Sequence, residues 1–144
     1  MSVLVIDASV AAKWVLPPER EAFAEQALDL LNRYSRREVD FVLPDFFWAE
    51  LGNVLWKAVR LGRCNQAAAE AGLASMRGRG LPTVPTEGIL ERAFAIATAF
   101  NRTVYDSLYV ALAIESRAQL ITADERLANA IAAHLPVKWL GALA

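Results

Sequence analysis

Four carboxylates stand at the borders of segments that are otherwise apolar, and they are Asp7, Glu50, Asp106 and Asp124. The apolar runs beside them are residues 3–6, 46–51, 108–114 and 120–122, in that order. Burying a carboxylate costs free energy unless it is paired or holds a cation. Acids at the edges of core segments therefore suggest a site for a divalent metal.

Each acid also has an ordinary structural explanation. Aspartates at the start of a helix commonly cap free backbone N–H groups, and this contributes about 1 kcal/mol. Glu50 alone fits an exposed helix face, and Ser9 and Thr122 fit local hydrogen bonding. Composition and spacing by themselves leave the metal site and the helix caps equally supported.

Cysteine and histidine are too rare in this chain for several other kinds of site. The chain has one cysteine, Cys64, and one histidine, His134. A disulfide framework, a Cys/His zinc site and a Cys–His nucleophile pair are therefore not expected. Any catalysis must depend on carboxylates, hydroxyls, basic side chains or a bound ion.

The charge of the chain is compatible with an RNA substrate. The formal net charge is −1, and removing the four acids from that count leaves +3 on the rest. Twelve of the fifteen basic residues are arginines, whose planar guanidinium suits phosphate. The candidates for binding an RNA backbone are Lys13, Arg36, Arg37, Arg79 and Arg102. An exposed surface charge is the alternative for each of them.

Hydrophobicity is high, at 56% apolar residues and a mean hydropathy of +0.28. The longest apolar runs, 93–100 and 108–114, are much shorter than the ~18–20 residues that span a bilayer, and Asp7 interrupts the first run too early for a signal peptide. We therefore expect a cytoplasmic protein with no membrane segment, one domain over 1–144, and an oligomer that covers apolar surface.

Strands and helices are expected to alternate along the chain. The predicted strands are 3–6, 41–43, 119–122 and 137–140, with a possible short one at 82–85. The predicted helices are 8–16, 19–33, 45–61 (with Asp45 as its N-cap), 65–77, 87–101, 105–117 and 124–133. This pattern predicts an α/β fold with a mostly parallel sheet of four to five strands covered on both faces.

The fold class explains how the acids would meet. Ligands of open α/β sheets bind at the carboxyl ends of the strands. Asp7 and Asp124 each follow a strand closely, and Asp106 lies in the first turn of its helix. Glu50 shares a helix stripe with Asn53 and Lys57, beside the face expected to be buried.

Four ordered segments resemble the PIN-domain family, and more narrowly its VapC toxin branch. They are Val5-Ile6-Asp7-Ala8-Ser9, Glu50-Leu51-Gly52-Asn53, Tyr105-Asp106-Ser107-Leu108-Tyr109 and Leu120-Ile121-Thr122-Ala123-Asp124. The resemblance covers nearly the whole chain and implies a three-layer α/β/α sandwich. It also implies a Mg²⁺- or Mn²⁺-dependent endoribonuclease, usually a homodimer, that a small cognate antitoxin inhibits.

The resemblance also implies roles for individual residues. Asp7 and Asp106 are implied as the principal metal ligands, and Glu50 and Asp124 as further acids that act directly or through water. Ser9, Asn53 and Thr122 match polar positions that line the site.

Other functions fit the sequence less well. A non-catalytic PIN-like module that binds RNA or a protein is the main alternative. An aspartyl-phosphate phosphatase would need a second aspartate where Ser9 stands, and a receiver domain would need paired acids there.

Among the aromatic residues, we expect Trp56 to pack in the core, whereas Phe46 or Trp48 on the outer side would serve a dimer or an antitoxin.

Overall fold

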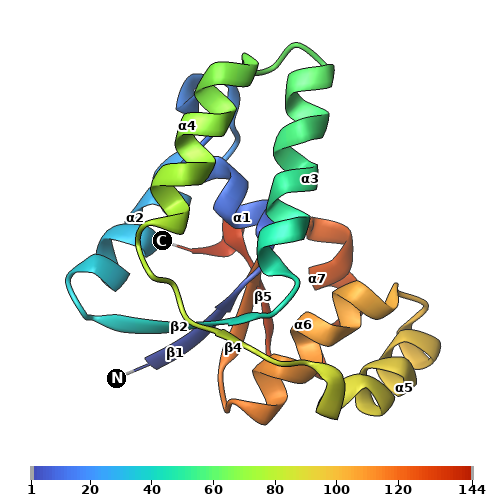
Figure 1. Ribbon diagram of the computed structural model, residues 1–144. Coiled ribbons are helices and arrows are strands. Elements are labelled where there is room, and N and C mark those ends of the chain that lie inside the picture. Colours follow the sequence, from blue (N-terminus) through green and yellow to red (C-terminus); the bar gives the residue numbers. More distant parts are fainter. Residues whose placement is uncertain (1, 144) are drawn as a thin grey trace.

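The computed structural model describes residues 2–143, which form a five-stranded parallel sheet between two layers of helices (Figure 1). The strands are β1 (Ser2–Ile6), β2 (Val39–Pro44), β3 (Thr83–Val84), β4 (Gln119–Thr122) and β5 (Val137–Trp139). Their order across the sheet is β3-β2-β1-β4-β5, and every pair is parallel. The predicted parallel α/β sheet is confirmed.

The α-helices are α1 (Ala8–Ala11), α2 (Ala24–Ser35), α3 (Phe47–Arg60), α4 (Gln66–Arg77), α5 (Leu90–Phe100), α6 (Val104–Glu115) and α7 (Glu125–Ile131). Short 3-10 helices occupy residues 12–14, 18–20, 87–89 and 140–142. Among the described residues 2–143, none of the helices combines the length and the apolar character that crossing a bilayer requires.

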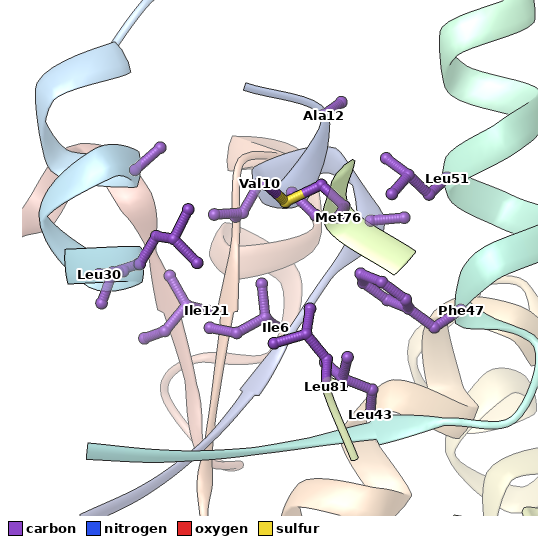
Figure 2. Packing of buried hydrophobic residues seen from close by; sticks show 14 of the residues in the cluster. Ile6, Val10, Ala12, Leu30, Leu43, Phe47, Leu51, Met76, Leu81 and Ile121 are labelled. Atoms are coloured by element: carbon purple, nitrogen blue, oxygen red, sulfur yellow. The ribbon is translucent and has the colours of Figure 1, made fainter. Parts of the chain in front are cut away.

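The side chains of β1 divide between the two helical layers. Leu4 and Ile6 pack in the core formed with α1, α2, α3 and α4, as Figure 2 shows around Ile6, Leu43 and Phe47. Val5, between them, points to the opposite core, built with α5, α6 and α7. Both faces of the central strand are buried, which explains why its sequence is apolar without alternation.

Three of the predicted helices have boundaries that the contacts of the structure correct. The helix predicted from Asp45 begins at Phe47, because the Asp45 carboxylate instead accepts hydrogen bonds from the backbone N–H and the hydroxyl of Thr86. The helix predicted over 8–16 is an α-helix only to Ala11 and continues as a 3-10 turn. The helix predicted from 19 begins at Ala24, since Phe23 adopts a left-handed conformation with φ of 58°.

The connections of α3 and α6 bring their first turns to one edge of the sheet. Helix α3 follows the carboxyl end of β2, so it starts at that edge. Helix α6 leads into β4 through a short turn at 116–118 and runs against the strand direction, so its start lies at the same edge. The ends of β1 and β4 complete this edge, because Ile6 is in register with Ile121.

Candidate active site

Asp7 occupies the centre of this edge and is only 8% exposed. Its backbone N–H donates to the carbonyl of Ile121 at 3.1 Å, which fixes it beside the end of β4. One carboxylate oxygen accepts a hydrogen bond from the Thr122 hydroxyl at 2.7 Å. The other accepts the N–H of Ser9 at 3.4 Å, so Asp7 is also the N-cap of α1.

Burial raises the pKa of Asp7, and the hydrogen bonds from Thr122 and Ser9 only partly offset this effect. The negative charge of Asp106 raises it further. A cation bound beside Asp7 would stabilise its ionised form in these surroundings.

Ser9 and Thr122 connect the ends of the two central strands. The hydroxyl of Ser9 accepts the backbone N–H of Ala123 at 3.1 Å. The fully buried Thr122 hydroxyl accepts the N–H of Asp124 at 3.0 Å while it donates to Asp7. Both residues therefore lie beside the acids, and they fix the backbone that carries Asp124.

Asp124 lies at the start of α7 and has two neighbours. Its Oδ1 accepts the N–H groups of Arg126 and Leu127 at 3.0 and 3.2 Å, so the carboxylate caps the helix. Its Oδ2 lies 3.4 Å from Nη2 of Arg102. The helix-cap explanation thus holds for Asp124, while its second oxygen contacts Arg102.

Asp106 lies in the first turn of α6 but does not cap it, because the Thr103 hydroxyl accepts its N–H at 3.0 Å. Its Oδ2 lies 3.5 Å from Nη2 of Arg102. Burial raises the pKa of Asp106, the Arg102 guanidinium lowers it, and the negative charge of Asp124 raises it again.

Glu50 points from the first turn of α3 towards the same acids. Burial raises its pKa to about 6, the hydroxyl of Tyr109 counteracts this, and the charges of Asp7 and Asp106 add to the rise. Its Oε2 is buried and has no hydrogen-bond partner among the described residues. Buried carboxylate oxygens normally accept a hydrogen bond or contact a cation, and Oε2 of Glu50 does neither within the described residues.

Tyr109 is a site residue that the sequence did not single out. Its ring is buried on α6, and its hydroxyl accepts the N–H of Ala8 at 3.3 Å. Burial, followed by the charges of Asp7 and Glu50, raises the pKa of Tyr109, so the hydroxyl keeps its proton and can donate it to a carboxylate. Its position one turn after Asp106 was the available signal.

Asn53, predicted to line the site, and the basic residues predicted to bind the RNA backbone fall in different places. Asn53 is exposed on α3. Arg36 pairs with Glu38 on the surface. Arg37 and Arg79 line a separate pocket with Tyr34, Ser35 and Asp40. Only Lys13 and Arg102, of the five predicted basic residues, lie beside the acids.

A cavity of about 410 Å³ is lined by Asp124 and by one side of α3, and we call it the basic groove. Ser9 and Asp124 line it beside the acidic site, its basic side chains are Lys13, Lys57 and Arg63, and Glu21 is its second acid. Lys13 pairs with Glu21 at 3.3 Å. Lys57 and Arg63 are exposed, and Arg63 was missed because it lies in the turn after α3, where sequence alone gave it no neighbour.

The residues at this edge suit a divalent cation in donor type. Carboxylate oxygens are the ligands that Mg²⁺ prefers, and two of these acids already share the cationic guanidinium of Arg102. Among residues 2–143, however, no three Asp, Glu, His or Cys side chains are gathered into a complete metal site. Coordination by three or more acids would require their side chains to move.

Trp56 corrects one prediction about the core. It is 57% exposed on α3, and the Arg60 guanidinium lies 5.2 Å from the centre of its ring. Phe46 and Trp48 are instead half-buried against Tyr109 and Phe47. With Leu55, Val59 and Leu73, Trp56 lines an apolar cavity of about 300 Å³ between α3 and α4.

The chain is similar to proteins of one family over most of its length. A family model described as PIN domain matches residues 4–132. Ribonuclease VapC3 of Pyrobaculum aerophilum is 33% identical over 128 residues, which cover 88% of this chain and 92% of that protein.

Solved structures show the same fold. VapC20 of Mycobacterium tuberculosis, a toxin that cleaves the sarcin–ricin loop, aligns with a TM-score of 0.63 and 14% identity, over 92% of this chain and 95% of that one. VapBC2 of Rickettsia felis, bound to a DNA fragment from their promoter, aligns with a TM-score of 0.65 and 12% identity, over 95% and 98%. At these identities the likeness concerns the fold.

Proposed function

Because the chain belongs to the PIN-domain family and to its VapC branch, we propose that it is an endoribonuclease, the toxin of a toxin–antitoxin pair. It hydrolyses RNA phosphodiester bonds with Mg²⁺ or Mn²⁺ held by Asp7, Glu50, Asp106 and Asp124. The observation that carries this proposal is that four separate segments place acids at the carboxyl edge of the sheet, where burial and the charges of neighbouring acids raise the pKa values of Asp7, Glu50 and Asp106.

The four acids have different roles in binding the metal. Asp7 and Asp106 are the principal metal ligands, and Glu50 and Asp124 act directly or through water. When bound, the divalent ion supplies a water of lowered pKa as the nucleophile and offsets charge on the scissile phosphate. The raised pKa values of Asp7, Glu50 and Asp106 support this assignment, because a bound cation would relieve their burial and mutual repulsion.

The remaining groups orient the acids and the substrate. Thr122 holds one oxygen of Asp7, which leaves the direction of that carboxylate fixed. Tyr109 keeps Ala8 and Glu50 in place around it. An acidic site repels phosphate by itself, so the RNA backbone needs cations on its path, and the basic groove with Lys57 and Arg63 supplies them.

The partners we propose are those of the VapC branch: an RNA substrate, a cognate antitoxin and a second copy of the chain in a homodimer. The relative solved as VapBC2 with promoter DNA supports the antitoxin. Exposed aromatic side chains on α3, α5 and α6, namely Trp56, Phe94 and Tyr105, support partner contacts because they leave apolar surface in water.

The test is cleavage of total RNA and of tRNA by the purified protein in Mg²⁺, in Mn²⁺ and in EDTA, beside Asp7→Asn. Discrete products that need metal and vanish in the variant are the expected result. Intact RNA under every condition, from protein shown to be free of antitoxin, would contradict the proposal. It would favour a non-catalytic PIN-like module that binds RNA or a protein.

A further inference from the structure

Arg102 is a basic residue that contacts two of the acids at the sheet edge. It lies in the short turn between α5 and α6, directly after Asn101, whose φ of 55° ends α5. Its backbone N–H donates to the carbonyl of Ala97 at 3.1 Å, which fixes the turn. The side chain is 23% exposed and reaches towards the starts of α6 and α7.

One nitrogen of this side chain serves two acids. Nη2 lies 3.5 Å from Oδ2 of Asp106 and 3.4 Å from Oδ2 of Asp124. These carboxylates come from different elements and repel each other. The guanidinium thus occupies a position between two acids of the proposed metal site, where a divalent cation would serve the same electrostatic purpose.

The contacts of Arg102 are weaker than an arginine can make. Charge-assisted N–H···O bonds are commonly about 2.7–2.9 Å long, and arginine often binds a carboxylate through two nitrogens at once. Here both distances are longer and both involve the same nitrogen. Nε is buried without a hydrogen-bond partner among the described residues, and such a donor is costly to leave unpaired.

We propose that Arg102 is an internal counter-ion of the acidic site, which competes with the divalent metal for Asp106 and Asp124 and, once displaced, binds an RNA phosphate. This inference rests on the proposed function. The free Nε and the unused NH₂ group give the released guanidinium a fork that fits two phosphate oxygens. Arg102 is therefore a positioning residue for the acids and a binding residue for the substrate.

A purely structural ion pair makes a different prediction. If Arg102 only held Asp106 and Asp124 in place, removing it would disorder the acids and weaken metal binding. If it competes with the metal, removing it strengthens metal binding. The sign of the change in metal affinity separates the two roles.

The experiment is isothermal titration calorimetry of Mn²⁺ into the wild type, Arg102→Met and Arg102→Gln. Met keeps the apolar stem of the side chain, and Gln gives a second neutral variant if Met impairs folding. Arg92→Met is the matched control, because Arg92 on α5 pairs with Glu115 with side chains 51% and 63% exposed, away from the acids. We expect Mn²⁺ to bind the Arg102 variants about tenfold more tightly, since a competing charge is gone, and the control to bind like the wild type.

Two further readouts complete the test. In EDTA, the Arg102 variants should melt at a lower temperature than the wild type, because Asp106 and Asp124 then repel without a counter-ion. With saturating Mn²⁺, their KM for RNA should rise more than their kcat falls.

The outcomes separate this inference from the proposed function. Mn²⁺ affinity that is equal or weaker in Arg102→Met and Arg102→Gln would overturn the competition. Absence of Mn²⁺ binding in the wild type and in both variants would overturn the metal site, and with it the proposed function as well as this inference.

Discussion

At the scale of single residues, Asp7 shows how one carboxylate takes part in both structure and the proposed chemistry. It caps α1, accepts a hydrogen bond from Thr122, and lies in the electrostatic range of Glu50 and Asp106. Its burial opposes ionisation. Replacing its charge should therefore affect activity and stability in opposite directions.

Asp7→Asn should reduce RNA cleavage by at least about 100-fold, since even groups that only orient metal ligands contribute about 10- to 100-fold. The same change should raise the melting temperature in EDTA, because Asn keeps the cap and acceptor oxygen without the buried charge. Asp29→Asn, at an exposed position of α2, is the control. A lower or equal melting temperature for Asp7→Asn would count against a cluster of repelling acids.

Glu50 should make the stability of the metal-free protein depend on pH. Its pKa rises from 4.5 to about 6 on folding, so the folded state holds this proton more tightly than the unfolded chain does. The free energy of unfolding therefore falls as the pH rises from about 4.5 to about 6, by about 1 kcal/mol once partial solvent screening of the carboxyl is allowed for.

Urea unfolding of the wild type and of Glu50→Gln between pH 4.5 and 7, in EDTA, measures this effect. The difference in stability between the two proteins isolates Glu50 from the other titrating groups. Gln should gain relative stability as the pH rises, whereas Glu25→Gln, exposed in the first turn of α2, should not. A difference that is constant with pH would refute the raised pKa of Glu50.

At the scale of elements, the end of β4 and the start of α7 form one hydrogen-bonded unit. Thr122 contacts Asp7 and the N–H of Asp124, Ser9 accepts the N–H of Ala123, and Asp124 caps α7. Because the acids are built into the backbone connections, their positions follow from the fold. The cap and the charge of Asp124 are nevertheless separable.

Asp124→Asn should keep the cap of α7 and its stability, whereas Asp124→Ala should lose about 1 kcal/mol, or about 2–4 °C in melting temperature for a chain of this size. Both variants should lose RNA cleavage, since both remove the charge. Asn65→Ala, which removes the cap of α4 and leaves every acid in place, is the matched control. It should lose stability and keep activity. Full activity in Asp124→Asn would remove Asp124 from the site.

Local sequence signals predicted the elements well and their starts less well. Buried strands such as β1 are apolar on both faces, and Asn65 caps α4 through the N–H of Ala68 as its residue type suggests. Asp45 failed as a cap because Thr86, 41 residues later, competes for its carboxylate. Tertiary contacts of this kind are absent from local patterns.

In the site, too, local sequence signals were readable and tertiary contacts were not. The edge at which the acids lie could be predicted because each acid follows a strand or lies in the first turn of a helix. The contact of Arg102 with Asp124 spans 22 residues, and the basic groove joins Lys13 to Arg63. Such partners depend on how the helices pack, which the sequence pattern did not specify.

At the scale of the whole molecule, the net charge of −1 conceals an uneven distribution. Acids gather at the sheet edge, and Lys57 and Arg63 lie beside them along the basic groove. An RNA strand that reaches the acids would follow this groove, so its affinity should depend on these two side chains more than on total charge.

Binding of a short single-stranded RNA at several salt concentrations tests this path. In an Asp7→Asn background, which keeps the RNA intact, Lys57→Ala/Arg63→Ala should reduce the magnitude of the slope of log K against log salt by about 1.4, or about 0.7 for each lost phosphate contact. Arg36→Ala/Arg92→Ala removes the same charge from exposed ion pairs elsewhere and should leave the slope unchanged. Equal slopes for the two double variants would mean that the RNA responds to net charge alone and does not follow the groove. A smaller slope only for the groove variant would place the backbone of the bound RNA between α3 and the acids, where the proposed cleavage requires it.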